Sequence, residues 1–335
     1  MNLDSLGIEK ALELFPDQVR KGFSQAFSAD LPLVSPKSVV ISGMGGSSNA
    51  GKILQGLFES DLKIPFEVFN DYGLPAWVNS DTLVIVNSYS GNTEETLSAI
   101  EAANKVNAKV IAVTAGGKLK DMIQAGQIEG AFVNDSKVNP SHLPKVGLGV
   151  SLGALAGALA KAGVLNIQEV ELSAALNELA EIRKSWDAKE TAEWLNGSLP
   201  ILFAGRPLLG ALNAGRNAMC EISRNFIQFY DFPEVNHVLI EATQKPEIIK
   251  SSAKYLFFMS KFNNPRVLMR FKITAGIFKE QGLEFNDYSL KGSTKLVQVM
   301  ELPHFCAWVG FHLSILQNTD PGPEPWINKL KESLS

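Results

Sequence analysis

Short apolar runs that end in glycine or a small polar residue alternate with helical patterns along the first half of the chain. β-Branched runs of this length, bounded by turns and separated by helices, are typical of parallel strands that are buried on both faces. The runs of the first half are Ser38–Gly43, Phe66–Phe69, Thr82–Asn87, Lys109–Thr114 and Ala131–Val133. The alternation therefore predicts a doubly wound α/β sheet.

The alternation stops and then begins again in the second half. Leu148 to Leu195 has helical spacing and no strand signal. The later candidate strands are Leu199–Gly205, Val238–Ala242, Tyr255–Met259 and Leu296–Val299. We therefore predict an α/β fold of two doubly wound parallel-sheet sandwiches: residues 1–150 with leading helices, a helical linker over 151–195, and a second domain over 196–335 that ends in a terminal helix.

Composition excludes several classes of function. The chain has 335 residues, 45% of them hydrophobic and 20% charged, with a net charge of −4, so it lacks the basic excess of a nucleic-acid-binding protein. Cys220 and Cys306 lie far apart, and no metal-type cluster of His, Cys and Asp is present, so we expect neither a metal nor a cofactor. No signal-peptide pattern or bilayer-length apolar run is found, so we expect a cytoplasmic protein without membrane contact.

A glycine-rich turn follows the first predicted strand. Gly45, Gly46 and Ser47 lie between that strand and a helix, where glycines permit close backbone approach and the helix start offers free N–H groups to an anion. The glycine spacing fits neither a dinucleotide fingerprint nor a Walker sequence. A tight connection alone would also explain the glycines, so this signal is weak by itself.

A second polar segment follows the strand Thr82–Asn87. Ser88, Ser90 and Thr93 place three hydroxyls at the start of a helix, which makes a phosphate cradle of neutral donors. A helix cap would explain one hydroxyl but does not require three. The segment therefore predicts a phosphate-binding site.

These segments resemble a known family. SYSGNTEET over Ser88–Thr96, with GMGGS upstream, resembles the sugar isomerase (SIS) domain, and the whole chain resembles the bifunctional phosphoglucose/phosphomannose isomerases, which carry two such domains. Supporting matches are Asp71–Pro75, Phe232–His237 and Asp320–Pro321, in the family's order. The resemblance implies an isomerase that interconverts glucose 6-phosphate and/or mannose 6-phosphate with fructose 6-phosphate through a cis-enediol.

The resemblance also implies site residues. Glu221 matches the family's base, and His237, 16 positions later, matches the histidine that assists ring opening. Lys331 matches the family's C-terminal lysine, with Lys329 as an alternative. Lys145 stands where the family has an arginine. Because the family borrows its histidine from a neighbouring subunit, we expect a homodimer in which His237 crosses the interface.

Departures from the family leave alternatives open. Lysine does not reproduce arginine's bidentate fork at Lys145, and Gly322 replaces the family's threonine, which puts turnover and epimer preference in doubt. An SIS isomerase or deglycase for another (amino)sugar phosphate, or a regulator that only binds a sugar phosphate, would share the cradle. Without the resemblance, Glu221 would be interpreted as a surface carboxylate paired with Arg224.

Overall fold

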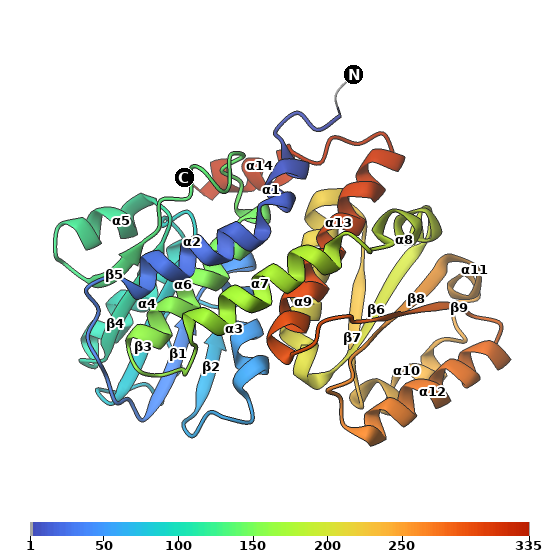
Figure 1. The fold of residues 1–335 in the computed structure, drawn as a ribbon, viewed down its shortest axis with the longest axis horizontal. Helices are drawn as coiled ribbons and strands as arrows, with labels where there is room; N and C mark the ends of the chain where they lie inside the picture. Colours follow the sequence, from blue (N-terminus) through green and yellow to red (C-terminus); the bar gives the residue numbers. More distant parts are fainter. Residues whose placement is uncertain (1–2, 335) are drawn as a thin grey trace.

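The computed structural model describes residues 3–334 and contains two parallel β-sheets with helices around and between them (Figure 1). The strands are β1 Ser38–Ser42, β2 Phe66–Phe69, β3 Thr82–Ser88, β4 Lys109–Thr114, β5 Glu129–Phe132, β6 Leu199–Gly205, β7 Gln228–Phe232, β8 Ala253–Met259 and β9 Glu284–Ser289. The predicted fold class, two parallel-sheet α/β units, is confirmed. The predicted boundaries at residues 150 and 195 stay predictions.

In each sheet the first strand along the chain has the second strand on one side and the third strand on the other, so the direction of winding reverses there. The first sheet has the order β2-β1-β3-β4-β5 and the second the order β7-β6-β8-β9, with all neighbours parallel. In doubly wound sheets, ligands bind beyond the carboxyl ends of the two strands that flank such a reversal. In the first sheet those strands are β1 and β3, and the polar segments that follow them are the two that the sequence singles out.

Helices connect and cover the strands. They are α1 Ile8–Glu13, α2 Phe15–Phe27, α3 Gly45–Phe58, α4 Glu94–Lys105, α5 Gly117–Gln124, α6 Leu148–Lys161, α7 Glu169–Arg183, α8 Ala188–Leu195, α9 Leu209–Ser223, α10 Leu239–Ala242, α11 Ile248–Ser252, α12 Pro265–Glu280, α13 Lys295–Leu316 and α14 Pro325–Leu334, with short 3-10 turns η1 Pro144–Val146, η2 Arg206–Leu208 and η3 Glu234–His237. Figure 1 shows α3, α9 and α13 between the two sheets.

Two strand predictions are wrong. Val238–Ala242 lies mostly in the short helix α10, and Leu296–Val299 begins the long helix α13. α13 is buried around most of its circumference, so its sequence lacks the polar stripe that marks a surface helix. The edge strands β7 and β9 were not predicted, because half-exposed strands with polar residues lack a continuous apolar run.

α13 also corrects the expectation that no segment could cross a bilayer. By length and composition it passes that test, but 78% of its apolar window is buried inside the protein. Its buried polar side chains have partners within the fold, since Glu301 accepts from Tyr288 Oη and His304 Nε2 contacts the Leu12 carbonyl at 2.8 Å. Within residues 3–334, α13 is a core helix.

One apolar core extends through both domains. It joins the inner faces of the two sheets, through residues such as Ile41 and Leu202, with the helices between them. Small residues allow close helix packing there: a Cβ on Gly153 of α6 would lie 2.1 Å from the Val19 carbonyl of α2. The domains therefore share a continuous interior, which fixes their relative position.

This packing gives a test of fold stability. We expect Gly153→Ala to lower the free energy of unfolding by about 1–3 kcal/mol, because overpacking against backbone outweighs the gain in helix propensity. Gly276→Ala is the matched control, since Gly276 lies in α12 and a Cβ there meets nothing within 4 Å. That variant should gain about 0.5–1 kcal/mol in urea unfolding. Equal effects of the two substitutions would contradict the close α2–α6 packing.

Candidate active site

The antiparallel contact of α3 with α9 brings the two domains' functional segments together. A Cβ on Gly210 would lie 2.1 Å from the Lys52 carbonyl, so the two helix backbones meet there. Farther along, Asn213 Nδ2 donates to Asn49 Oδ1 at 2.8 Å. Glu221 lies eight residues beyond Asn213, ~12 Å along the helix axis. This geometry carries Glu221 past the start of α3, toward the loop that follows β1.

The hydroxyls of the predicted phosphate cradle interlock at the carboxyl ends of β1 and β3. Ser88 Oγ and Thr93 Oγ1 share a hydrogen bond of 2.8 Å, and the Tyr89 N–H donates to Ser47 Oγ at 3.0 Å. Ser90 Oγ lies 3.4 Å from the Asn92 nitrogen at the exposed tip. The structure therefore brings Ser47, Ser88, Ser90 and Thr93 into one cluster of loops.

The starts of α3 and α4 at this cluster lack side-chain caps. Met44 precedes α3 and Thr93 precedes α4, and neither side chain accepts a hydrogen bond from its helix. The Thr93 hydroxyl contacts Ser88 instead, so it does not serve as the helix cap that the sequence left as an alternative. Two uncapped helix starts side by side favour an anion such as phosphate.

Glycine at position 91 lets the phosphate loop lie against its neighbour. Gly91 has a φ of +71°, and a Cβ there would overlap the Gly116 carbonyl. A side chain would therefore displace the loop that carries Ser88, Ser90 and Thr93. Gly45, with a φ of +51°, likewise takes the left-handed conformation at the start of α3.

Tyr89 connects the phosphate loop to the segment that carries Lys145. Its hydroxyl donates to Asp135 and accepts from Asn139 Nδ2 at 2.6 Å. Its ring covers Gly147, where a Cβ would lie 2.6 Å from the ring. Because the Tyr89 hydroxyl is partly buried and has a hydrogen-bond partner on each side, these contacts hold η1 beside the cradle.

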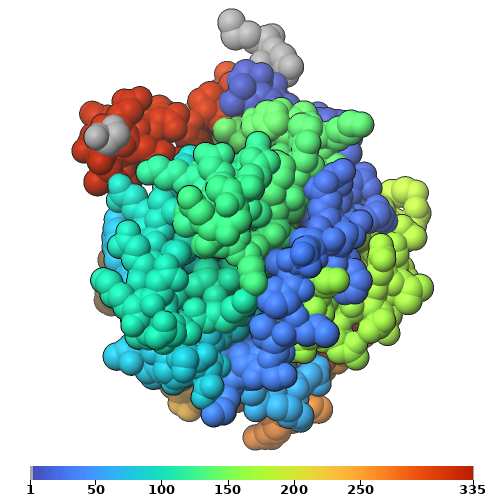
Figure 2. Space-filling view, turned by 90° about the vertical axis from the view of Figure 1, so that its left-hand side faces the viewer, coloured from blue at the N-terminus to red at the C-terminus, as the bar shows by residue number. Residues whose placement is uncertain are grey.

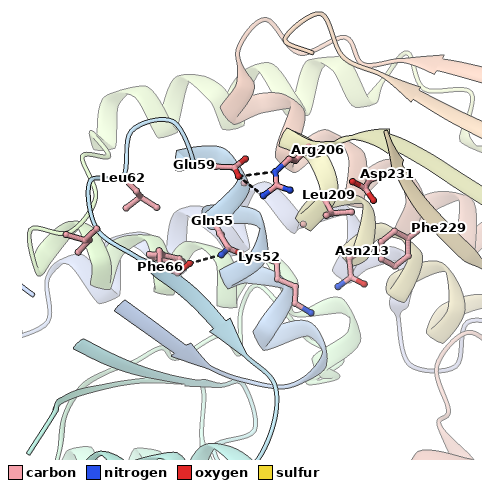
Figure 3. Close-up of a pocket in the computed structure, with 13 residues that line it drawn as sticks. Lys52, Gln55, Glu59, Leu62, Phe66, Arg206, Leu209, Asn213, Phe229 and Asp231 are labelled. Carbon is pink, nitrogen blue, oxygen red and sulfur yellow. Dashed lines mark hydrogen bonds and ion pairs between the residues drawn. The ribbon is translucent and has the colours of Figure 1, made fainter. Parts of the chain in front are cut away.

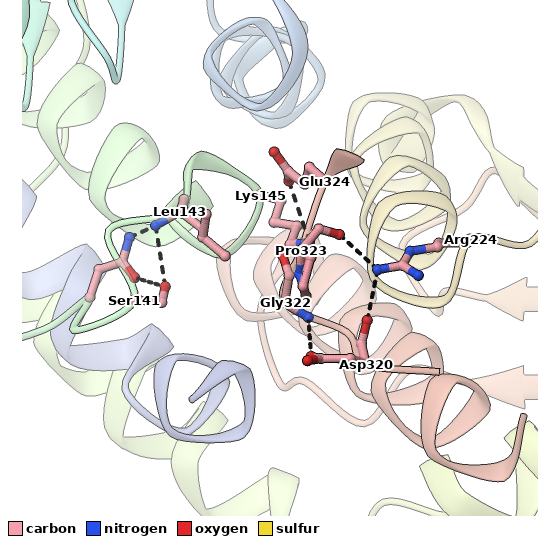
Figure 4. A network of polar contacts seen from close by, with 9 residues as sticks. Ser141, Leu143, Lys145, Arg224, Asp320, Gly322, Pro323 and Glu324 are labelled. Carbon is pink, nitrogen blue, oxygen red and sulfur yellow. Dashed lines mark hydrogen bonds and ion pairs between the residues drawn. The ribbon is translucent and has the colours of Figure 1, made fainter. Parts of the chain in front are cut away.

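Lys145 is a buried lysine that the C-terminal segment encloses (Figure 4). Its side chain is fully buried, and Nζ donates to the Gly322 carbonyl at 2.8 Å and lies 3.4 Å from Glu324 Oε1. Burial lowers the pKa of Lys145, while Glu324 and Glu221 favour its charged form. The nearby carboxylates therefore stabilise the charged form of Lys145 against the cost of burial.

We call residues 320–324 the C-terminal strap. Arg224 adopts the left-handed conformation just after α9 and donates to the carbonyls of Asp320 and Pro323, at 2.9 and 2.8 Å (Figure 4). Arg224 therefore binds the strap and does not pair with Glu221. A Cβ on Gly322 would lie 2.9 Å from Leu6, so a threonine here would press on the leading segment. Figure 2 shows the C-terminal residues, in red, at the edge of the first domain.

Glu221 has the electrostatics of a general base. The pKa of its carboxyl is raised from 4.5 to about 7, first by burial and then by the charge of Glu324. Lys145, Lys331 and Arg216 oppose this rise. A carboxylate that is half ionised near neutral pH can both accept and return a proton, which is the behaviour that acid–base catalysis needs.

The remaining predicted residues are placed differently. Lys331 lies on the exposed helix α14, and its charge acts on Glu221, whereas Lys329 Nζ lies over the Trp326 ring at 5.8 Å. His237 is exposed in η3, beyond β7 of the second domain. Among the hydrogen bonds and ion pairs within residues 3–334, none joins His237 to Glu221. Its role stays a prediction.

Sequence reasoning missed four side chains of the site. Glu324 and Arg216 act on Glu221 only because tertiary packing brings distant segments together, so no local pattern marks them. Tyr89 lies inside the phosphate-loop motif itself, and its burial among polar partners could have been suspected. Asp135 completes that contact from a loop without a sequence signal.

The raised pKa of Glu221 predicts a pH-dependent cost in stability. In the unfolded chain the carboxyl ionises near its ordinary value, whereas in the folded chain it ionises near 7. The contribution of the Glu221 carboxyl to the free energy of unfolding is fully present below pH 4.5, where the group is protonated in both states, and is lost as the pH rises toward 7. Glutamine does not ionise, so Glu221→Gln removes this pH-dependent loss. We expect the variant to gain about 2 kcal/mol more in free energy of unfolding over the wild-type protein at pH 8 than at pH 4.5.

Urea unfolding at the two pH values measures this difference. Glu101→Gln is the matched control, because Glu101 is exposed on α4. If Glu221→Gln and Glu101→Gln changed stability equally at both pH values, the buried position of the Glu221 carboxyl would be wrong.

Comparisons with known proteins agree with this site. Residues 184–334 match the family model described as the bacterial phospho-glucose isomerase C-terminal SIS domain, and residues 32–120 match the SIS domain. A bifunctional phosphoglucose/phosphomannose isomerase of Caldicellulosiruptor bescii is 30% identical over 96% of each chain, and one of Thermoplasma volcanium is 29% identical over 95% of this chain and 96% of its own.

A solved structure has the same fold at low identity. The tagatose-6-phosphate ketose/aldose isomerase of Escherichia coli superposes with a TM-score of 0.71 at 13% identity, over 95% of this chain and 97% of its own. At that identity the likeness shows the fold alone. The full-length relatives confirm the resemblance that the motifs indicated: the chain belongs to the bifunctional phosphoglucose/phosphomannose isomerase family.

Proposed function

We propose that the protein interconverts glucose 6-phosphate or mannose 6-phosphate with fructose 6-phosphate. The observation that carries this proposal is the Glu221 carboxyl, which is partly buried, has a pKa near 7, and is carried by α9 toward a phosphate cradle of the other domain. The family's relatives are named for both isomerase activities. A cytoplasmic location stays a prediction.

The cradle would fix the sugar by its phosphate. Ser47, Ser88 and Thr93 supply hydroxyls, and the starts of α3 and α4 supply backbone N–H groups. Because this end of the substrate does not react, its binding energy serves to orient the other end. With the phosphate held there, C1 and C2 of the open-chain sugar extend toward Glu221.

Glu221 would move one proton between two carbons. As a carboxylate it removes the C2 proton of the aldose, which leaves a cis-enediolate with its charge on O1. The O2 hydroxyl proton then passes to O1, and Glu221 returns its proton to C1 as the carbonyl forms at C2, which gives the ketose. Proton and electron counts balance, because the reaction is an isomerisation. Glucose 6-phosphate and mannose 6-phosphate differ only in configuration at C2, and C2 is planar in the enediolate. Both sugars therefore give the same enediolate, which accounts for activity on both.

Lys145 would stabilise the enediolate oxygen. Its buried Nζ lies 3.4 Å from Glu324 Oε1, and its charge acts on the Glu221 carboxyl. A preorganised charge in a site that excludes water is typically worth a few kcal/mol at the transition state. Lys331, on α14, is a second cation whose charge acts on the same carboxyl.

We propose that His237 acts from a second subunit of a homodimer. His237 is exposed, and among residues 3–334 no hydrogen bond or ion pair connects it to the site of its own chain. Exposed apolar side chains lie nearby, among them Tyr230 of β7 and Val238, which is 64% exposed. Apolar surface around a polar functional residue supports an interface there.

Deuterium exchange tests the base. In D2O, the wild-type protein should form fructose 6-phosphate from each aldose phosphate and introduce deuterium at C2, followed by NMR. Glu221→Gln should slow both processes at least about 100-fold, because it removes the proton acceptor. If Glu221→Gln retained exchange at the wild-type rate, another residue would have to be the base.

The pH profile tests the charge environment of the base. We expect kcat/KM to fall below about pH 7 as Glu221 becomes protonated. Lys145→Met should move this acidic limb to higher pH, because the Lys145 charge lowers the pKa of Glu221. Lys105→Met, which removes an exposed charge on α4, is the control and should leave the limb in place.

Mixed dimers test the shared site. Glu221→Gln and His237→Ala should each be nearly inactive alone. When the two are unfolded together and refolded at equal amounts, mixed dimers would contain one site with both native residues, so about a quarter of wild-type activity should return. If His237 acts within its own chain, no mixed dimer contains an intact site and activity stays lost.

A further inference from the structure

A cavity of about 650 Å³ lies between the two domains, away from the predicted site residues (Figure 3). One wall is formed by α3 and the segment leading into β2, and the other by η2, the start of α9, and β7. None of the residues assigned to the isomerase site lines it. Cavities of this size are typical of small-molecule sites.

One end of the cavity is balanced in charge. Arg206 donates to Glu59 Oε1 through Nε and Nη2, at 3.1 and 2.9 Å, and this pair joins the two domains (Figure 3). The charge of Asp231 also favours the protonated guanidinium. The charges of Glu59 and Asp231 balance the charge of Arg206, so this end of the cavity does not need an added anion.

The other end of the cavity is lined by one cation, Lys52, and a second cation, Arg216, lies behind the lining residues Asn213 and Phe229. Lys52 lies on α3, and its pKa is lowered by burial and by the charge of Arg216. Arg216 lies over the Phe229 ring at 5.1 Å and donates to Asn213 Oδ1 at 3.1 Å. Within residues 3–334, Lys52 and Arg216 make no ion pair at contact distance, although the charge of Arg216 also acts on Glu221, and Arg216 Nε is buried without a hydrogen-bond partner.

Two like charges that lie close together in a partly dry region, here Lys52 in the cavity wall and Arg216 behind it, are unfavourable unless an anion neutralises them. A buried donor without a partner adds to that cost. Asn213 and Gln55 add polar groups to the walls, and Leu62, Leu209 and Phe229 add apolar surface. This combination suits a ligand with a charged head and a carbon body.

We propose that this cavity binds a small phosphorylated metabolite, whose phosphate contacts Lys52 at the end of the cavity nearest Arg216 and whose carbon part lies against the apolar wall. The site is distinct from the phosphate cradle, since no residue of the cradle lines it. A ligand held there contacts both domains and so bridges α3 and α9.

Inorganic phosphate is the probe, and the cradle must first be disabled. In a Ser88→Ala/Thr93→Val background, isothermal titration should still detect one phosphate per chain. Adding Lys52→Met should weaken this binding at least about tenfold, since it removes a charged partner. Adding Lys272→Met instead, which removes an exposed charge in the middle of α12, should leave the affinity within about twofold.

Unchanged affinity on adding Lys52→Met, or no phosphate binding in the background variant, would overturn the proposal. If the Lys52→Met variant does not fold, tungstate soaked into crystals of the wild-type protein decides: anomalous density beside Lys52 supports the site, and density at Ser88 alone refutes it. Isomerase activity of the wild-type protein, measured without phosphate, tests the proposed function separately.

Discussion

The contact between the α3 and α9 backbones determines where every functional group of this protein lies. Only glycine at position 210 allows it, since a Cβ there would collide with the Lys52 carbonyl. Asn213 and Asn49 then fix the register with a buried amide hydrogen bond. Because the two helices run antiparallel, the end of α9 in the second domain extends past the start of α3 in the first. A carboxylate from one domain thus approaches a phosphate cradle of the other.

The C-terminal strap couples the electrostatics of the site to the fold. Glu324 lies 3.4 Å from Lys145 Nζ, and its charge also raises the pKa of Glu221. Glu324 therefore favours the charged form of the buried lysine and, together with burial, raises the pKa of Glu221 to about 7. Arg224, directly after α9, holds the strap through two carbonyls. Burying these charges costs stability, a common feature of active sites.

The sequence predicted the parts of this structure that depend on local patterns. β1, β3, β4, β6 and β8 are continuous apolar runs that end near glycine or serine, so their type and order could be inferred. The first turn of α13, Leu296–Val299, was predicted as a strand because burial around most of the helix removes its helical periodicity. The Ser88–Thr93 hydroxyls were recognisable by position. Glu221 and His237 were identified only by resemblance, and Glu324 and Arg216 could not be found, because their roles arise from tertiary packing.

A crystal structure of the Glu221→Gln variant with fructose 6-phosphate tests the central claim most directly, namely that a cradle in one domain and a carboxylate from the other act on one substrate. We predict the phosphate within hydrogen-bonding distance of Ser47, Ser88 and Thr93, with residue 221 beside C1 and C2 of the sugar. A sugar phosphate bound in the cradle with its C1–C2 end directed away from residue 221, or bound outside the cradle, would contradict this account.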